Sequence, residues 1–171
     1  MKERKTIKVK EYISPCGEMM LGSIDGKLCM CDWLNDTHHR KVKKRLERLL
    51  HANLESDTSE EIERAEQELD EYFAGTRKEF DIPLFTVGTD LQQEVWSELQ
   101  KIPYGETISY KELAERMGRA DAIRAVANAV GNNAISLFIP CHRIIGSNNA
   151  LTGYAGGLEA KRTLLELEGG G

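Results

Sequence analysis

The residue pair with the clearest capacity for chemistry is Cys141 beside His142. A thiolate is the strongest nucleophile among ordinary side chains, but a cysteine with the usual pKa of about 8.5 is mostly protonated at neutral pH. A neighbouring base such as His142 corrects this. Because adjacent side chains of an extended segment point to opposite faces, contact between the two needs a water molecule or a local turn.

A histidine that acts as a base is usually oriented by a third group. Glu168, at the end of the last predicted helix, is a candidate for that role. Spacing alone does not separate it from Glu159 or Glu166.

Other interpretations of the cysteines stay open at this point. Cys141 follows an apolar stretch at 135–139, predicted to be a short buried strand, so it is also explained as a small buried residue. A cysteine hydrolase built on Cys141 and His142 would need an oxyanion hole and a substrate cleft, for which no further signature is present. Four side chains could form a zinc site on paper: Cys29, Cys31, His38 and His39. The Cys-x-Cys pair lies in a strand pattern and lacks the usual ligand spacing, so we predict no metal.

Charge neither predicts nor excludes a nucleic-acid partner. The net charge of −5 argues against phosphate binding, but the distribution of charge matters more than its sum. Residues 51–81 hold eleven acidic and three basic side chains, a balance of −8, which leaves +3 for the remainder. No apolar run approaches the roughly 20 residues of a membrane-spanning helix. The first five residues are polar, so we expect a cytoplasmic protein with free thiols and no membrane partner.

The N-terminal half is typical of a small antiparallel sheet with helices. The expected strands cover residues 6–13, 19–24 and 27–33, and Asp25-Gly26 is a strong hairpin signal. Apolar residues at helical spacing predict helices at 41–50 and 60–73, the second ended by Gly75. Residues 77–88 are interpreted as a linker.

Two capping boxes organise the C-terminal half. Thr89-Asp-Leu-Gln92 opens a helix to about residue 101, and Ser109-Tyr-Lys-Glu112 opens a short helix ended by Gly118. A second short helix follows at about 120–130, and a last helix at 158–168. The second short helix is expected to bury Ile123, Val126, Ala127 and Val130, with Arg124 and Asn128 on another flank. The pair is a helix-turn-helix candidate, although a helical hairpin that only packs a core explains the same pattern. A turn is expected at 146–149.

Several ordered motifs in this half resemble the methylated-DNA–protein-cysteine methyltransferases, also called 6-O-alkylguanine-DNA alkyltransferases. The active-site motif of that family resembles IPCHRI at 139–144. The segment IPYGETISY at 102–110 resembles the family's lead into its helix-turn-helix, and RAV at 124–126 resembles the start of its recognition helix. The family's final loop and helix resemble GYAGGL at 153–158 and LLELE at 164–168. The N-terminal half resembles the family more loosely.

The resemblance implies a two-lobed α/β (α+β) fold. It places an N-terminal sheet-and-helix domain at 1–84 and a C-terminal, mostly helical, winged-helix-like domain at 85–171. The second domain would bind DNA and carry the alkyl acceptor.

The resemblance also implies roles for individual residues. Cys141 is the alkyl acceptor, His142 the base acting through a water, and Glu168 the group that orients His142. Asn133 is the hinge between the recognition helix and the active-site segment. Tyr110 contacts the backbone phosphate and can donate a proton to guanine. DNA contacts are expected from Arg124, as the finger that replaces the extruded base, and from Tyr110, Ala125, Asn128 and Arg143. The alkyl pocket is expected at Tyr154, Ala155 and Gly156.

The implied reaction moves an alkyl group from 6-O-alkylguanine in double-stranded DNA, and less readily from 4-O-alkylthymine, onto Cys141. It needs no cofactor, consumes one protein per base, and is expected of a monomer. Two positions depart from the family pattern: Ala134 follows the hinge where proline is frequent, and Ala155 stands where some members have serine. A binder resembling the alkyltransferase-like proteins is the alternative, but those proteins lack the acceptor cysteine.

Overall fold

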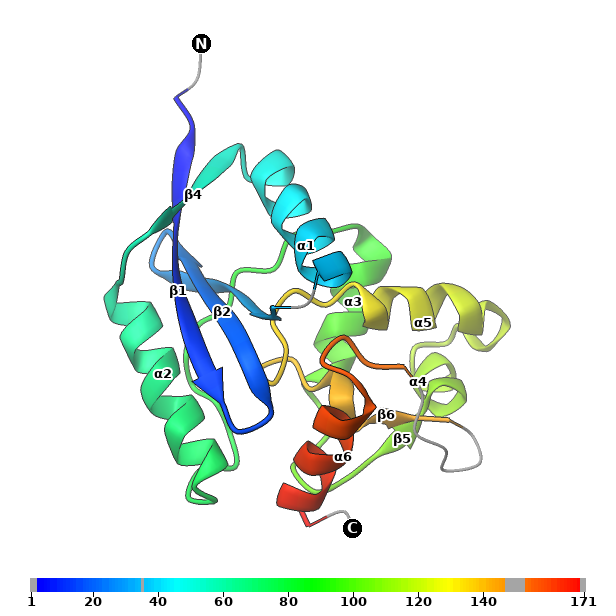
Figure 1. Ribbon diagram of the computed structural model, residues 1–171. Helices are drawn as coiled ribbons and strands as arrows, with labels where there is room; N and C mark the ends of the chain where they lie inside the picture. The colour runs from blue at the N-terminus through cyan, green and yellow to red at the C-terminus, as the bar shows by residue number, and fades with distance from the viewer. Residues whose placement is uncertain (1–2, 35, 147–152, 170–171) are drawn as a thin grey trace. The chain divides into compact units, whose positions relative to one another are not determined.

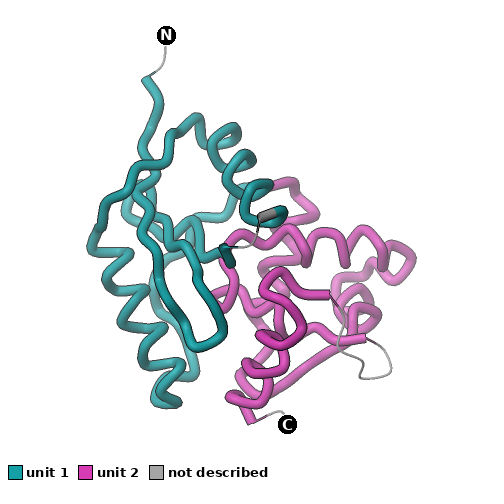
Figure 2. The backbone as a smooth tube through the Cα atoms, in the orientation of Figure 1, with its two compact units in different colours: residues 1–87 teal, residues 88–171 magenta. Residues whose placement is uncertain are grey.

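The computed structural model describes residues 3–34, 36–146 and 153–169 of a chain that forms two compact units, residues 1–87 and 88–171 (Figure 2). The first unit is built on a sheet and the second mainly on helices (Figure 1). The domain division predicted between residues 84 and 85 stays a prediction. Within the described ranges, no helix combines the length and apolar character that crossing a bilayer requires.

The sheet of the first unit has four strands in the order β3-β2-β1-β4. Three of them form the predicted antiparallel meander: β1 (Lys5–Ser14), β2 (Gly17–Ile24) and β3 (Lys27–Trp33). The hairpin between β2 and β3 turns at Asp25 and Gly26, which both have positive φ angles (51° and 78°), as a tight primed turn requires. The fourth strand, β4 (Ala52–Ser56), pairs in parallel with β1 and was not predicted.

Two helices complete this unit: α1 (Asp36–Leu49) and α2 (Glu60–Phe73). The α1 helix begins five residues before the predicted start. The Ser59 hydroxyl accepts a hydrogen bond from the backbone N–H of Ile62 and so caps α2. The predicted linker at 77–88 also contributes to the sheet, because Leu28 donates its N–H to Pro83 and accepts one from Phe85.

In the second unit, α3 (Asp90–Leu99) opens with the predicted capping box of Thr89 and Gln92. The helix-turn-helix pair is α4 (Tyr110–Arg116), capped by Ser109, and α5 (Ile123–Gly131). A 3₁₀ turn, Ala120–Ala122, precedes α5, and α6 (Leu158–Leu167) ends the unit. Two short strands, β5 (Ile108–Ser109) and β6 (Ile144–Ile145), pair in parallel. This pairing ties the start of α4 to the residues that directly follow the turn at 141–143.

Two predictions for this unit are wrong. Residues 135–139 do not form a strand: the backbone turns through Leu137, which has a φ of 73°, and Ser136 and Ile139 form an isolated bridge. On α5, Val126 and Val130 are buried as predicted, but Ala129 completes the buried face, whereas Ala127 is half-buried and Ile123 is 37% exposed. The turn predicted at 146–149 lies mostly outside the described residues, which resume at residue 153.

Candidate active site

The backbone between α5 and Cys141 is organised by the side chain of Asn133, which is 2% exposed. Its Oδ1 accepts the N–H of Ile135 at 2.9 Å, and its Nδ2 donates to the carbonyl of Ile139 at 2.9 Å. The same Nδ2 lies 3.2 Å from Sγ of Cys141. One amide therefore fixes the turn at 133–139 and also contacts the thiol, and the role of Asn133 as a hinge stays a prediction.

Cys141 is the first residue of a 3₁₀ turn, Cys141–Arg143, that follows Pro140. Its side chain is buried, and burial raises the pKa of the thiol. The Asn133 amide and the positive charge of Lys161 lower this pKa but do not outweigh the burial. The resting group is therefore the neutral thiol, and forming a thiolate requires a base.

His142 is completely buried, and its Nε2 lies 2.8 Å from Oε2 of Glu168. A carboxylate only accepts hydrogen bonds, so this contact assigns the ring proton to Nε2. In the neutral ring Nδ1 is then the unprotonated acceptor, and it has no hydrogen-bond partner among the described residues. Burial lowers the pKa of His142, with Arg143 acting in the same direction and Glu168 opposing it. The site therefore contains a neutral imidazole whose Nδ1 can take up a proton.

Glu168 is the C-cap residue of α6 and is buried, whereas Glu159 and Glu166 are exposed. The structure thus separates the three glutamates that spacing could not. The interior placement follows from the helix period, because Glu168 continues the buried stripe that includes Leu164 and Leu165.

Arg143 was predicted to contact DNA, and the structure contradicts this. The side chain is buried, with Nε donating to Oε1 of Glu168 at 2.8 Å and Nη2 donating to Oε2 at 3.0 Å. Its Nη1 donates to the carbonyl of Ile102 at 2.6 Å. All three guanidinium nitrogens are therefore committed inside the unit, so Arg143 belongs to the Glu168 cluster and not to an outer surface.

The other predicted DNA contacts lie on the helix-turn-helix pair. Arg124, Ala125 and Asn128 are all exposed on α5, and Tyr110 is half-buried as the first residue of α4. The helix is anchored from its opposite side by Trp96, whose indole N–H donates to the carbonyl of Ala129 at 3.0 Å. The exposed face of α5 is thus carried on a fixed support.

Two domain families match adjoining parts of the chain. Residues 7–86 match the family described as 6-O-methylguanine DNA methyltransferase, ribonuclease-like domain. Residues 90–170 match the family described as 6-O-methylguanine DNA methyltransferase, DNA binding domain. Over 158 residues the chain is 42% identical to the methylated-DNA–protein-cysteine methyltransferase of Methanosarcina barkeri, and the alignment covers 91% of this chain and 92% of that protein. The chain belongs to this family.

Further relatives in the methylated-DNA–protein-cysteine methyltransferase family differ in how much of their length is matched. The constitutive protein of Bacillus subtilis is 49% identical over 117 residues, which cover 68% of this chain and 71% of that protein. The Mycobacterium bovis protein is 54% identical over 104 residues, 61% of this chain. The match spans 63% of the length of that mycobacterial relative.

Crystal structures of the family share the fold. The Mycobacterium tuberculosis O6-methylguanine methyltransferase has a TM-score of 0.79 and 40% identity, over 95% of this chain and 92% of that chain. A structure of M. tuberculosis OGT in complex with DNA gives a TM-score of 0.80 at 40% identity, over 94% and 92% of the two chains. The two-part α/β fold predicted from the sequence is therefore confirmed.

The loop before α6 carries the predicted alkyl pocket. Tyr154, Ala155 and Gly156 are half-buried there, and their role as pocket residues stays a prediction. Sequence reasoning missed Lys161 in the helix that follows. This side chain is 1% exposed, and its ammonium donates to the carbonyl of Ile144. A signal was present, because Lys161 interrupts the apolar stripe of α6 one turn before Leu164 and Leu165.

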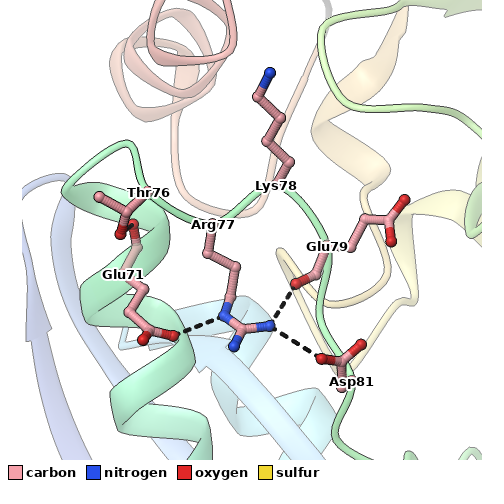
Figure 3. A pocket seen from close by; sticks show the side chains of 6 residues that line it. All are labelled: Glu71, Thr76, Arg77, Lys78, Glu79 and Asp81. Carbon is pink, nitrogen blue, oxygen red and sulfur yellow. Dashed lines mark hydrogen bonds and ion pairs between the residues drawn. The ribbon is translucent and has the colours of Figure 1, made fainter.

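The first unit has a pocket and a histidine cluster of its own. A pocket of about 630 Å³ is lined by Glu71, Thr76, Arg77, Lys78, Glu79 and Asp81 (Figure 3). Arg77 bonds to Glu71, to Asp81 and to the carbonyl of Glu79, so much of the local acidity is neutralised by one side chain (Figure 3).

The described residues do not form the zinc site that Cys29, Cys31, His38 and His39 could have supplied. His38 and His39 both bond to the buried Asp32 through Nδ1, at 2.9 and 3.1 Å. In the described part of the chain, no group of three or more His, Cys, Asp or Glu side chains is arranged to hold a metal, and none of the four cysteines forms a disulfide.

Proposed function

We propose that this protein repairs double-stranded DNA by transferring an alkyl group from 6-O-alkylguanine, and less readily from 4-O-alkylthymine, to Cys141. The observation that carries the proposal is the buried hydrogen bond between Glu168 and His142, the residue next to Cys141, with Nδ1 of His142 bonded to no described residue. Family membership supplies the reaction type, and this geometry supplies a base for the thiol of a member of that family.

The first step is removal of the thiol proton. Because burial raises the pKa of Cys141, the proton must move to Nδ1 of His142, either directly or through one water. Glu168 then faces an imidazolium, and its negative charge stabilises that form. A neutral thiol at rest also limits unwanted oxidation, since the thiolate is the reactive species.

In the second step, the Cys141 thiolate attacks the alkyl carbon. A carbon–sulfur bond forms, the bond from that carbon to the guanine oxygen breaks, and the oxygen keeps the bonding electron pair. Guanine is restored by taking up one proton, for which Tyr110 at the start of α4 is the proposed donor. The thioether product has no simple route back to a thiol, so one chain repairs one base.

Access to the alkyl carbon requires that the damaged nucleotide leave the helix, at a cost of a few kcal/mol. We assign α5 as the recognition helix, with Ala125 and Asn128 against the DNA. Arg124 fills the space left by the extruded base. The exposure of all three side chains supports this assignment. Tyr154, Ala155 and Gly156 are assigned to the pocket that receives the alkylated base.

The test is a stoichiometric transfer assay with intact-mass detection. Incubation with duplex DNA that contains 6-O-methylguanine should add one methyl group per chain of the wild type and none to Cys141→Ala. Size-exclusion chromatography of the same reaction mixture checks that the reacting species is a monomer. Unchanged mass with retained DNA binding would favour an alkyltransferase-like binder. Multiple turnovers on an ester substrate without a mass change would favour a hydrolase.

A further inference from the structure

The guanidinium group of Arg143 is placed where it can control the base of the reaction. We propose that Arg143 is a positioning residue: it keeps Glu168 ionised and correctly oriented, so that His142 rests as the neutral Nε2–H tautomer with Nδ1 ready to accept the proton of Cys141. The inference rests on the proposed function, and it replaces the DNA contact predicted for Arg143.

The first argument is the geometry of the carboxylate. Nε and Nη2 of Arg143 meet the two oxygens of Glu168 at 2.8 and 3.0 Å, the two-pronged arrangement that matches the planes of both groups. The third nitrogen, Nη1, is held by the carbonyl of Ile102 at 2.6 Å. The guanidinium is therefore fixed independently of Glu168 and can orient it.

The second argument concerns Oε2 of Glu168, which is shared. It lies 3.0 Å from Nη2 of Arg143 and 2.8 Å from Nε2 of His142. An oxygen that accepts from two donors cannot itself carry a proton toward either of them. The arrangement is consistent only with an ionised Glu168 and a protonated Nε2. The consequence for catalysis is that, in a neutral ring, the other nitrogen, Nδ1, carries the lone pair.

The third argument is charge. The positive charge of Arg143 offsets that of the Glu168 carboxylate, so His142 does not face an uncompensated buried anion. Burial is the main cause that lowers the pKa of His142; Arg143 and Lys161 also lower it, and Glu168 raises it. Tyr104 is the further titratable side chain here, with its ring centroid 5.9 Å from Cζ of Arg143. The neutral state of His142 thus results from opposing effects of several groups on its pKa, and Arg143 is the group that acts through Glu168.

Loss of the Arg143 charge should therefore shift this balance in a defined direction. A buried carboxylate without its cation would attract a proton to itself or to His142. If His142 becomes an imidazolium at rest, Nδ1 is occupied and cannot accept the thiol proton. If Glu168 becomes protonated, it no longer stabilises the imidazolium formed during transfer. In both cases activity is present above the raised pKa and is lost as the pH falls through it.

The experiment measures transfer from free 6-O-benzylguanine as a function of pH, because this substrate requires no DNA contact. At the acid end of the pH profile, Arg143→Met should lose about tenfold in rate for each unit by which the pKa of His142 or Glu168 rises. At the alkaline end, its rate should approach that of the wild type. Arg143→Lys keeps the charge without the two-pronged geometry, so it should retain the wild-type pH profile at a lower rate. The matched control is Arg64→Met, which removes an arginine from another buried glutamate, Glu68, in the first unit; its profile should equal that of the wild type.

A second measurement needs no variant at Arg143. Nitrogen-15 NMR of the wild type at neutral pH should show His142 as the neutral Nε2–H tautomer, with its signal assigned by loss in His142→Ala. An imidazolium in the wild type would overturn the proposal. A loss of rate in Arg143→Met that is the same at every pH would also overturn it. If Arg143→Met does not fold, the Arg143→Lys profile and the tautomer decide. Absence of transfer in the wild type would instead reject the proposed function.

Discussion

Replacing Glu168 with glutamine removes one negative charge while keeping the size of the side chain. In the native site this carboxylate accepts hydrogen bonds at 2.8 Å from His142 and at 2.8 and 3.0 Å from Arg143. The bond to His142 matters for the rate, since His142 must become an imidazolium as Cys141 loses its proton. The bonds to Arg143 matter for stability, since the guanidinium is buried.

The expected sizes follow from the types of these interactions. A hydrogen bond to a charged group contributes about 1.5–3 kcal/mol, and tenfold in rate corresponds to about 1.4 kcal/mol. Loss of the Glu168 charge should therefore slow transfer roughly 10- to 100-fold at neutral pH. Leaving a buried charge such as Arg143 without its partner destabilises a protein by about 3–5 kcal/mol.

The assay compares Glu168→Gln with Glu166→Gln, an exposed position on the same helix, by pH-dependent transfer and by urea unfolding. As the pH rises through the raised pKa of Cys141, more thiolate forms without help from His142, so the rate deficit of Glu168→Gln should shrink. The loss of stability should remain. Equal slowing by both variants, or a deficit that is constant with pH, would refute the role assigned to Glu168.

Three further predictions concern separate parts of the site. Cys141→Ala should gain no alkyl mass while binding duplex DNA almost as well as the wild type; a label on Cys16 or Cys29 of the wild type would contradict the assignment. Arg124→Ala should strongly slow repair of duplex DNA but barely affect free 6-O-benzylguanine, with partial rescue by Arg124→Lys; equal losses on both substrates would mean that Arg124 supports the fold. Asn133→Ala removes three buried contacts and should lower the free energy of unfolding by roughly 2–4 kcal/mol in urea titrations, besides slowing transfer; an unchanged midpoint would show that its amide does not hold the turn.

The sequence was most informative where a local pattern has a direct structural meaning. Thr89 and Ser109 cap α3 and α4 as predicted, because a capping side chain bonds to a backbone N–H only two or three residues away. The hairpin at Asp25 and Gly26 is equally local. By contrast, β5 and β6 have two residues each, too few to show any alternation, and their pairing joins residues 36 positions apart, such as Ile108 and Ile144.

The environment of a single charged residue was the hardest feature to predict. Arg143 follows the Cys-His pair in a sequence that resembles a family of DNA-binding proteins, and a DNA contact was expected of it for that reason. Whether it is buried depends on Glu168, which lies 25 residues later and reaches Arg143 only because α6 ends there. No periodicity within either segment contains that information. Lys161 could have been noticed, since it stands in an apolar stripe, but its partner carbonyl at Ile144 could not.

The conformation of residues 141–143 explains how three consecutive side chains serve different parts of one site. In a strand, Cys141 and Arg143 would point to one face and His142 to the other, so His142 and Arg143 could not both reach Glu168. A 3₁₀ turn has three residues per turn, which directs successive side chains about 120° apart. The thiol can then lie against Asn133 while both of its successors converge on Glu168. A local turn is therefore present at these residues, and the proton of Cys141 can pass to His142 directly or through one water. The turn is also what allows Arg143 to act on the base from the next position in the chain.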